Sequence, residues 1–292
     1  MRVDVSEIKT YRECHRKHLY SSRNRMKLYP RVTNDNLQFG TWFHECLHKM
    51  YMRTSIEDIL LWIDNTVENA DMNKMLTKMV TGYYETVYLE DASRYDILDI
   101  EHSFDWILDP VEYSDIHVCG SIDMLAVDKK NNTLVGFEHK SGKNFRPEIY
   151  DFIDEQPRLY YIILQMYLED HPELREKYPG ITVGGVMVNQ VKKLKTQFQY
   201  KRDLLSYSQK DLDNFLSSFM RDAIRILHRN PQDELPSPGF MKCQMCDYAD
   251  ICMKYGYENL TEDKILKDVD LNEEYYVKEK DHLDEKQEEF HS

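Results

Sequence analysis

Two neighbouring stretches of the chain bring acidic side chains close to a lysine. In the run GFEHKSG, Glu138 and Lys140 are separated by one residue, so in an extended strand both project to one face while His139 points to the other. Asp123 lies on the preceding predicted strand, and a turn at KKNN, residues 129–132, would fold it back across from Glu138. The sequence therefore predicts two carboxylates that face one ammonium group.

A set of this kind suits the hydrolysis of a phosphodiester. Mg2+ and Mn2+ prefer carboxylate oxygens and commonly use one or two carboxylates together with water and a substrate phosphate. Such an ion activates water and neutralises the charge that builds on the phosphoryl oxygens. Lys140 could position the attacking water, favour its ionised form or stabilise the developing charge. Taken alone, the motif also fits an exposed salt bridge, which contributes little to stability.

Polar residues on two predicted helices add to this set. Gln156 and Tyr160 lie four residues apart, so on a helix they face the same side. By themselves they would be an ordinary helix face. His44 falls in a predicted helix from about Gln38 to Met52, where apolar residues recur at helical spacing.

The run GSIDMLAVDKKNNTLVGFEHKSGK resembles the core of the PD-(D/E)XK nuclease superfamily, specifically of RecB-like exonucleases. In that family a GxxD strand, here 120–123, precedes an ExK strand, and a helix with QxxxY follows. The resemblance implies a restriction-endonuclease-like α/β core, with a sheet flanked by helices. It also implies that Gln156 and Tyr160 organise the catalytic lysine and the DNA end.

The same resemblance extends the predicted metal site. RecB-like enzymes carry a metal-binding histidine on a helix well before the acidic strands, and His44 matches it. Glu101, on the strand IEHSFDW, matches an additional acid of the family or is simply exposed. The metal ligands implied are His44, Asp123, Glu138 and the backbone carbonyl of His139. The catalytic residues implied are Asp123, Glu138, Lys140, Gln156 and Tyr160.

A competing motif overlaps this site. His44, Glu45 and His48 spell HExxH, the helix motif of zinc proteases, in which two histidines bind zinc and the glutamate acts as general base. That hypothesis leaves GxxD, ExK, QxxxY and the cysteines unexplained, so the protease is the remote alternative. Under the nuclease hypothesis, His48 is a core residue or supports the metal ligands, and Glu45 faces solvent.

The chain has six cysteines, and without a secretion signal they are expected to be thiols or metal ligands. Cys243, Cys246 and Cys252 form the run CQMCDYADIC, which needs a fourth ligand. Cys14 resembles the lone N-terminal cysteine that CRISPR-associated iron–sulfur exonucleases and AddB-type nucleases join to such a triplet to hold a [4Fe–4S] cluster. A zinc site with the same four cysteines is the alternative.

The predicted cluster would act as a structural clip. More than two hundred residues separate Cys14 from Cys243, and on the chain-entropy model closing such a loop stabilises by about 4 to 5 kcal/mol. Cys46 and Cys119 fall on an apolar helix stripe and in a strand, so we expect them to be small buried hydrophobes.

Charge is distributed unevenly along the chain. The net charge is −14, which argues against a protein that coats nucleic acid through an overall basic surface. The segment 261–292 has twelve acidic residues and five lysines, giving −7. We expect this tail to be solvated, with a frayed helix, a protein-binding tail or a DNA mimic as alternatives. The basic segment 190–202, QVKKLKTQFQYKR, fits either a phosphate-binding track or an exposed strand pair.

Periodicity predicts helices, then strands, then helices, which indicates one α/β domain with appendages. The predicted helices are Ser6–Tyr20 with Ser6 as N-cap, Gln38–Met52, Ile56–Tyr88 as one helix or two, Glu155–Leu168 and Asp211–His228. The predicted strands are Ile97–Leu108, Ile116–Asp128, Thr133–Lys140, Thr182–Gln190 and Thr196–Tyr200. The expected segments are a helical N-terminal part at 1–95, a nuclease core at 96–230, a cysteine segment at 231–257 and an acidic tail at 258–292.

These patterns together predict a metal-dependent DNA exonuclease that acts on single-stranded ends and leaves 5′-phosphates. The pathway could be DNA repair, recombination, or CRISPR or viral DNA processing. The chain shows neither a signal sequence nor a membrane span of eighteen apolar residues, so we expect a cytoplasmic protein. The alternative function is a nucleic-acid-binding or assembly module with little turnover, although such a module has no need of Lys140 beside two carboxylates.

Overall fold

The computed structural model describes residues 1–30, 35–109, 113–230, 233–255, 264, 267 and 275–277, so most of the acidic tail lies outside the described residues. The chain forms two compact units. The first comprises Met1–Thr33, Trp106–Val118 and Phe219–Ser292, and the second comprises Asn34–Asp105 and Cys119–Ser218. None of the described helices is long and apolar enough to cross a membrane.

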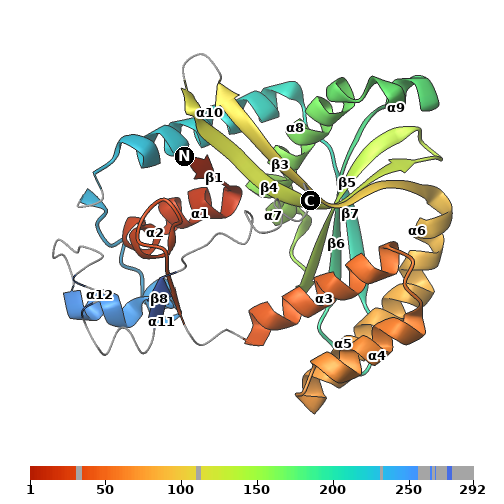
Figure 1. Cartoon of the computed structure of the whole chain (residues 1–292), viewed down its shortest axis with the longest axis horizontal. Coiled ribbons are helices and arrows are strands. Elements are labelled where there is room, and N and C mark those ends of the chain that lie inside the picture. Colours follow the sequence, from red (N-terminus) through yellow and green to blue (C-terminus); the bar gives the residue numbers. More distant parts are fainter. Residues whose placement is uncertain are drawn as a thin grey trace. The chain divides into compact units, whose positions relative to one another are not determined.

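The sheet of the second unit is mixed, and the chain has the predicted α/β architecture (Figure 1). Strand β5 pairs antiparallel with β4 and parallel with β6, which in turn pairs antiparallel with β7, while β3 pairs with β4. The bounds are Tyr95–Asp109 for β3, Tyr113–Asp128 for β4, Thr133–Gly142 for β5, Thr182–Lys192 for β6 and Tyr200–Leu205 for β7.

Helices cover both faces of this sheet. Met124 and Phe137 form one cross-strand pair, and both belong to the buried core together with residues of α3, α4 and α5. Gly136 faces the other way, where a Cβ would meet Leu164 of α8 at 3.4 Å. The helical bounds are Asp35–Tyr51 for α3, Ile56–Thr66 for α4, Ala70–Tyr83 for α5, Tyr84–Tyr88 for the π-helical turn η1, Leu89–Arg94 for α6, Glu148–Ile153 for α7, Glu155–Asp170 for α8, Pro172–Lys177 for α9 and Gln209–His228 for α10, which continues into the first unit.

The predicted turn between β4 and β5 is confirmed, since Asp128 pairs with Thr133. The Asp128 carboxylate organises the turn by accepting hydrogen bonds from the amide of Lys130 at 3.0 Å and from Asn131 at 2.8 Å. Asn132 takes a left-handed φ of 54°, a conformation that Asn tolerates better than most residues.

Two predictions in the second unit need correction. The strand expected at Thr196–Tyr200 is wrong, because β7 spans Tyr200–Leu205. The alternating pattern was misplaced because Phe198 packs on the α5 helix, where a Cβ on Gly82 would lie only 2.4 Å from its ring. The segment expected as one helix or two divides after Thr66, and Asn69 caps the second part by accepting from the amides of Asp71 and Met72.

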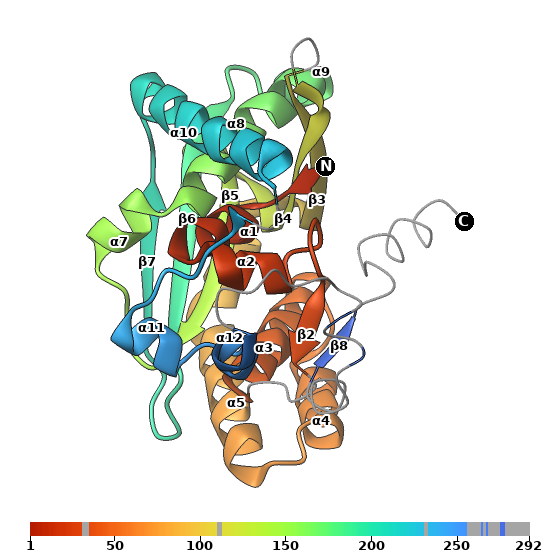
Figure 2. The ribbon, with the colours of Figure 1, turned by 90° about the vertical axis from the view of Figure 1, so that its left-hand side faces the viewer.

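The first unit contains the N-terminal helices and the cysteine segment. Its elements are β1 at Arg2–Val3, α1 at Val5–Glu13, α2 at His15–Ser21, β2 at Leu28–Pro30, α11 at Phe240–Gln244, α12 at Ala249–Tyr255 and β8 at Tyr275–Val277. Strand β2 pairs antiparallel with β8 (Figure 2). The single helix expected at Ser6–Tyr20 is wrong, because Cys14 is extended, with φ −160° and ψ 113°, and separates α1 from α2. The N-cap is Asp4 and not Ser6.

A buried polar network holds this unit together. The ring of His18 lies between two carboxylates, with Nε2 3.0 Å from Glu7 and Nδ1 3.1 Å from Glu234. Burial alone would lower the pKa of His18, but its hydrogen bonds to Glu234 and Glu7 outweigh burial and raise it. Arg25 adds an ion pair to Glu234 at 2.8 Å. The network therefore links the N-terminal helices to the segment that leads into the cysteines.

Candidate active site

The β4–β5 hairpin brings the two predicted acids together. Because Met124 pairs with Phe137, the adjacent residues Asp123 and Glu138 lie across from one another. The backbone amide of His139 donates to Asp123 Oδ2 at 2.6 Å, and His44 Nδ1 of α3 lies 3.6 Å from Asp123 Oδ1. All of these side chains belong to the second unit.

The lysine and the QxxxY helix complete the arrangement. Lys140 forms an ion pair with Glu138. Its ammonium also donates to Gln156 Oε1 at 3.2 Å, while Gln156 Nε2 donates to Glu138 at 3.1 Å and to the Tyr160 hydroxyl at 2.7 Å. Gln156 is held at the start of α8 because the Asp154 side chain caps the helix and accepts a hydrogen bond from the backbone amide of Gln156. The side-chain amide thus fixes acid, lysine and tyrosine relative to one another.

The glycine of the GxxD strand has a packing role. A Cβ on Gly120 would lie 2.8 Å from the ring of Phe104, so only glycine lets β3 place this ring against β4. Phe104 meets the Tyr160 ring edge-on, with centroids 6.2 Å apart. The Tyr160 hydroxyl donates to the carbonyl oxygen of Ser121. Gly120 therefore helps to position the tyrosine that contacts Gln156.

Electrostatics distinguish the two acids. Burial, with the Asp123 charge adding to it, raises the pKa of Glu138 to about 6. Burial also favours neutral Asp123, but the His44 hydrogen bond and charge outweigh it and lower the pKa of Asp123. The pKa of Lys140 is raised, because attraction to Glu138 exceeds the cost of burial. The site therefore combines an ionised aspartate, a cationic lysine and a more basic glutamate.

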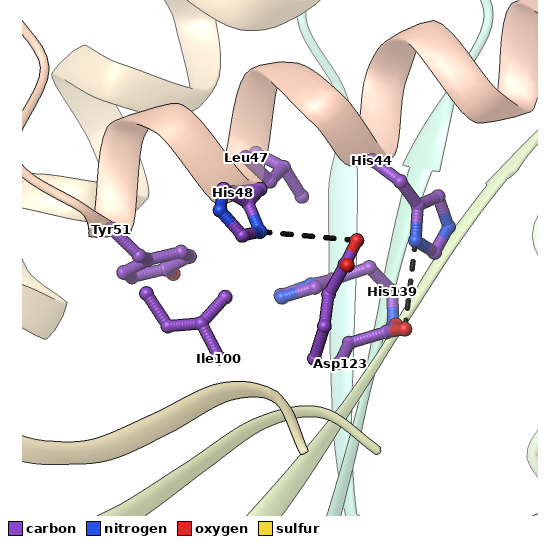
Figure 3. A pocket seen from close by; sticks show the side chains of 8 residues that line it. His44, Leu47, His48, Tyr51, Ile100, Asp123 and His139 are labelled. Atoms are coloured by element: carbon purple, nitrogen blue, oxygen red, sulfur yellow. Dashed lines mark hydrogen bonds and ion pairs between the residues drawn. The ribbon is translucent and has the colours of Figure 1, made fainter. Parts of the chain in front are cut away.

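A pocket opens beside Asp123 (Figure 3). His44, His48 and His139 line it together with Glu101, whose carboxylate lies 3.8 Å from His48 Nδ1. Glu101 has a φ of 53° although it lies within β3. Such a backbone is uncommon for any residue but glycine and is concentrated at functional sites. Glu101, which was predicted as an additional acid or an exposed residue, is exposed and lines this pocket.

The strained backbone of Glu101 leads to a paired prediction. We expect Glu101→Gly and Glu101→Ala to lower phosphodiester cleavage alike, by about tenfold or more, because both remove the carboxylate that supports His48. The glycine variant should be about 1 kcal/mol more stable than the alanine variant, because glycine adopts a positive φ without strain. Urea unfolding and cleavage rates measure the two effects. Equal stability of the variants would contradict the strain, and full activity of both would contradict a role for the carboxylate.

The structure adds a buried network that the sequence motifs did not include. Asn189 of β6 donates to His139 Nδ1 at 2.9 Å and accepts from Arg202 Nε at 3.3 Å. Arg202 is held by Asp91 through two hydrogen bonds at 2.5 and 2.7 Å. Burial lowers the pKa of His139 to about 4, so its ring is neutral. Because Nδ1 accepts from the Asn189 amide, the ring proton lies on Nε2. The only sequence signals were Asn189 in a predicted strand and Arg202 in the basic segment 190–202, just beyond the strand predicted at Thr196–Tyr200.

The donor set of the site fits a hard divalent cation. Asp123 and Glu138 supply carboxylate oxygens and His44 an imidazole nitrogen, and Mg2+ or Mn2+ completes its shell with water and phosphate. Within the described ranges, however, no three His, Cys, Asp or Glu side chains are gathered in a geometry that would hold a metal ion. Within these ranges, Cys14, Cys243, Cys246 and Cys252 are likewise not gathered in a metal-binding geometry.

Those four cysteines line one cavity of about 520 Å3 in the first unit. Backbone amides donate to two of the sulfurs, from Ser237 to Cys14 and from Gly239 to Cys243, each at 3.4 Å. Burial raises the pKa of Cys252, and the nearby Cys14 adds to the rise. The donor chemistry fits a site of four thiolates, and metal binding there would release protons. Cys46 and Cys119 are buried, as predicted.

Comparison with known proteins assigns the family. The sequence model of the PD-(D/E)XK nuclease superfamily matches residues 2–253. The chain belongs to the PD-(D/E)XK nuclease superfamily. Members of this superfamily typically use Mg2+ or Mn2+, and nucleic acid is the substrate class of a nuclease. No curated protein matches the chain in sequence.

Among solved structures, the chain is similar to a crystal structure from Eubacterium rectale described as a "Putative exonuclease". The TM-score is 0.50, with 11% sequence identity and 88% of each chain covered, which supports the PD-(D/E)XK nuclease fold. The crystal structure of SSO0001 is 13% identical over 86% of this chain and 85% of that chain, with a TM-score of 0.36. That score is too low to establish a shared fold.

The geometry also favours the nuclease over the HExxH protease. Glu45, which would be the general base of a protease, pairs with Lys49 at 2.9 Å on the exposed side of α3. His44 and His48 each face an acid of the sheet. The PD-(D/E)XK residues thus meet in one place, and the glutamate of HExxH lies outside it.

Proposed function

We propose that this chain is a metal-dependent deoxyribonuclease that removes nucleotides from single-stranded DNA ends and leaves 5′-phosphates. The observation that carries the proposal is the hydrogen-bonded set of Glu138, Lys140, Gln156 and Tyr160 next to Asp123. A binding platform has no use for a lysine held so closely between an acid and an amide. The neighbour described as an exonuclease supports action at an end.

Each residue has a distinct role in this proposal. Asp123, Glu138, His44 and the His139 carbonyl would hold Mg2+ or Mn2+, which when bound supplies charge neutralisation and water activation. Lys140 donates a hydrogen bond to the attacking water or to the phosphoryl oxygen that gains negative charge. Gln156 keeps the lysine aimed at that position. As the water oxygen bonds to phosphorus, it gives up a proton to solvent and the bond from phosphorus to O3′ breaks. O3′ takes up a proton from solvent, which leaves a 3′-hydroxyl and a 5′-phosphate.

End-labelled oligonucleotides test this proposal. The full-length protein is incubated with single-stranded, duplex and circular single-stranded DNA and with RNA, each in Mg2+, in Mn2+ and in EDTA. We expect metal-dependent release of mononucleotides or short products from linear single strands and none from circles. Glu45→Gln, which alters the exposed glutamate of HExxH, should cleave like the parent, whereas Asp123→Ala should not. Binding without cleavage in the parent protein would support the assembly module instead.

We also propose that Cys14, Cys243, Cys246 and Cys252 bind a [4Fe–4S] cluster that stabilises the first unit. Their position around one cavity and the amide donors to two sulfurs support this assignment. A zinc ion on the same thiolates is the competing occupant. The four cysteines belong to the first unit, so we expect the cluster to act on the stability of that unit.

Metal analysis of anaerobically purified protein decides between the two occupants. About four iron atoms per chain and brown colour are expected, as required by four-thiolate clusters. Cys246→Ser should lose the iron and lower the thermal midpoint, whereas Cys46→Ser, at a buried cysteine outside the cavity, should keep the iron. One zinc atom per chain without iron would rule the cluster out.

A further inference from the structure

Helix α7, with the sequence EIYDFI, presents apolar side chains to solvent. Ile149 is 61% exposed, Tyr150 57% and Ile153 49%, whereas Asp151 of the same helix is only 1% exposed. The pattern is the reverse of a surface helix, whose apolar side normally faces the core. Exposed apolar groups gathered in this way mark interaction sites more often than isolated ones do.

The helix is held firmly in this orientation. Gln190 of β6 donates to the Asp151 carboxylate at 2.6 Å and accepts from the amide of Arg146 at 2.7 Å. The Arg146 guanidinium in turn contacts Asp151 at 3.4 Å and Asp154 at 2.8 Å. The polar groups of α7 are thus used to fix it to the sheet, which leaves its apolar groups outward.

This position adjoins the candidate active site. Gln190, which anchors α7, pairs in the sheet with Lys140. Asp154 is the C-cap of α7 and the N-cap of α8. Its side chain accepts a hydrogen bond from the backbone amide of Gln156. Figure 2 shows α7 next to β7. Helix α7, with its exposed apolar groups, is therefore connected to α8, which carries Gln156, and to the strand that pairs with Lys140.

Lysines lie at the same end of the sheet. Lys192 pairs with Gly142, two residues beyond the pair of Lys140 and Gln190, so its Cα is about 7 Å further along the strands. That distance is close to one nucleotide step of an extended strand. The ammonium of Lys192 lies 4.5 Å from the centre of the Phe145 ring, which places a cation and an aromatic face together.

The positive charge of Lys143 and Lys192 is not compensated by neighbouring acids among the described residues. Neither Lys143 nor Lys192 forms an ion pair with any residue in the described part of the chain. Lys193, whose ammonium lies 4.7 Å from the Phe39 ring, has its pKa lowered by burial and by repulsion from Lys143. Lys143 and Lys192, which have no acidic partner among the described residues, are therefore suited to bind an anion.

We propose that Lys143 and Lys192 together with the apolar face of α7 form a track for an unpaired nucleic-acid strand beside the candidate active site. The inference rests on the proposed nuclease function and names the part of the chain that selects single strands. The lysines contact phosphates next to the scissile one, and Tyr150 with its isoleucine neighbours contacts base faces. Basic residues interleaved with aromatic ones bind single strands in this way, whereas a duplex hides its base faces by stacking.

Binding measured without turnover tests the track. Fluorescence anisotropy of the full-length protein with labelled oligothymidine, and with a blunt duplex of equal length, is recorded in the absence of Mg2+ and Mn2+. Tyr150→Ala should weaken single-strand binding about tenfold and change duplex binding less than about threefold. Lys192→Gln should reduce the slope of log affinity against log salt by about 0.7. Leu61→Ala and Lys78→Gln, at exposed positions of α4 and α5, are the matched controls and should bind like the parent.

The outcomes separate this inference from the proposed function. Unchanged single-strand affinity in Tyr150→Ala and Lys192→Gln overturns the track even if the parent protein cleaves DNA. Weakened affinity in both variants supports the track even if the parent does not cleave. If Tyr150→Ala leaves DNA binding intact but converts an oligomer to a monomer in sedimentation, the apolar face is an interface between copies and the track is overturned.

Discussion

Replacing Lys140 by methionine is expected to lower kcat for DNA cleavage by about 10^3-fold, the upper range for losing a group that stabilises developing charge. Methionine keeps the length of the side chain but removes the ammonium that pairs with Glu138 and donates to Gln156. The KM for DNA should change little, because the lysine contacts the reacting phosphate and not the rest of the strand. Single-turnover kinetics in saturating Mn2+ measure the chemical step directly.

The controls for this prediction use the same residue type elsewhere. Lys49→Met removes a lysine whose partner is the exposed Glu45 and should leave kcat within about twofold, because exposed pairs contribute little. Lys140→Arg keeps the charge but places a planar group beside Gln156, so partial activity is expected. If Lys140→Met cleaves at the parental rate, the lysine is a structural partner of Glu138 and the proposed chemistry is wrong.

The sequence predicted those parts of the site that depend on local periodicity. Glu138 and Lys140 share a face because strands alternate, and Asp123 reaches them because a short turn sets the register. Gln156 and Tyr160 meet through one helical turn. Each of these relations lies within one strand, one hairpin or one helical turn, so a sequence pattern can encode it.

Features that depend on distant packing were not predictable. The start of β7 was misplaced because Phe198 packs on Gly82, more than a hundred residues earlier in the chain. Glu101 takes a positive φ within the continuous strand β3, although its local composition predicts regular strand backbone. The break at Cys14 within an apparently continuous helix also follows no local rule. In each case a tertiary contact or a strained backbone determines the local conformation, and residue propensities do not predict that conformation.

The polar network behind His139 is the largest such omission, and it carries the second strong prediction. Asp91 is 1% exposed. It accepts two hydrogen bonds from Arg202, at 2.5 and 2.7 Å, and one from the Tyr51 hydroxyl at 2.6 Å. The carboxylate raises the pKa of Arg202 despite the opposing effect of burial, so the arginine stays charged in the core.

We expect Asp91→Asn to lower the free energy of unfolding by about 3 to 5 kcal/mol, because it leaves the buried Arg202 cation without a counter-charge. Urea unfolding followed by tryptophan fluorescence is suitable, since Trp42 and Trp62 both belong to the second unit. The exposed pair of Glu45 and Lys49 provides the control, and Glu45→Gln should cost less than about 0.5 kcal/mol.

A double variant distinguishes an uncompensated charge from a simple loss of packing. Asp91→Asn combined with Arg202→Met removes both charges and should recover much of the stability, because replacing a whole buried ion pair costs far less than removing one partner. If the double variant is as unstable as the sum of the two single variants, the charges act independently and the pair does not organise the core. Recovery of stability without recovery of cleavage would assign the arginine a second task. That task would be to orient Asn189, whose amide donates to Nδ1 of His139 and so keeps the ring proton on Nε2.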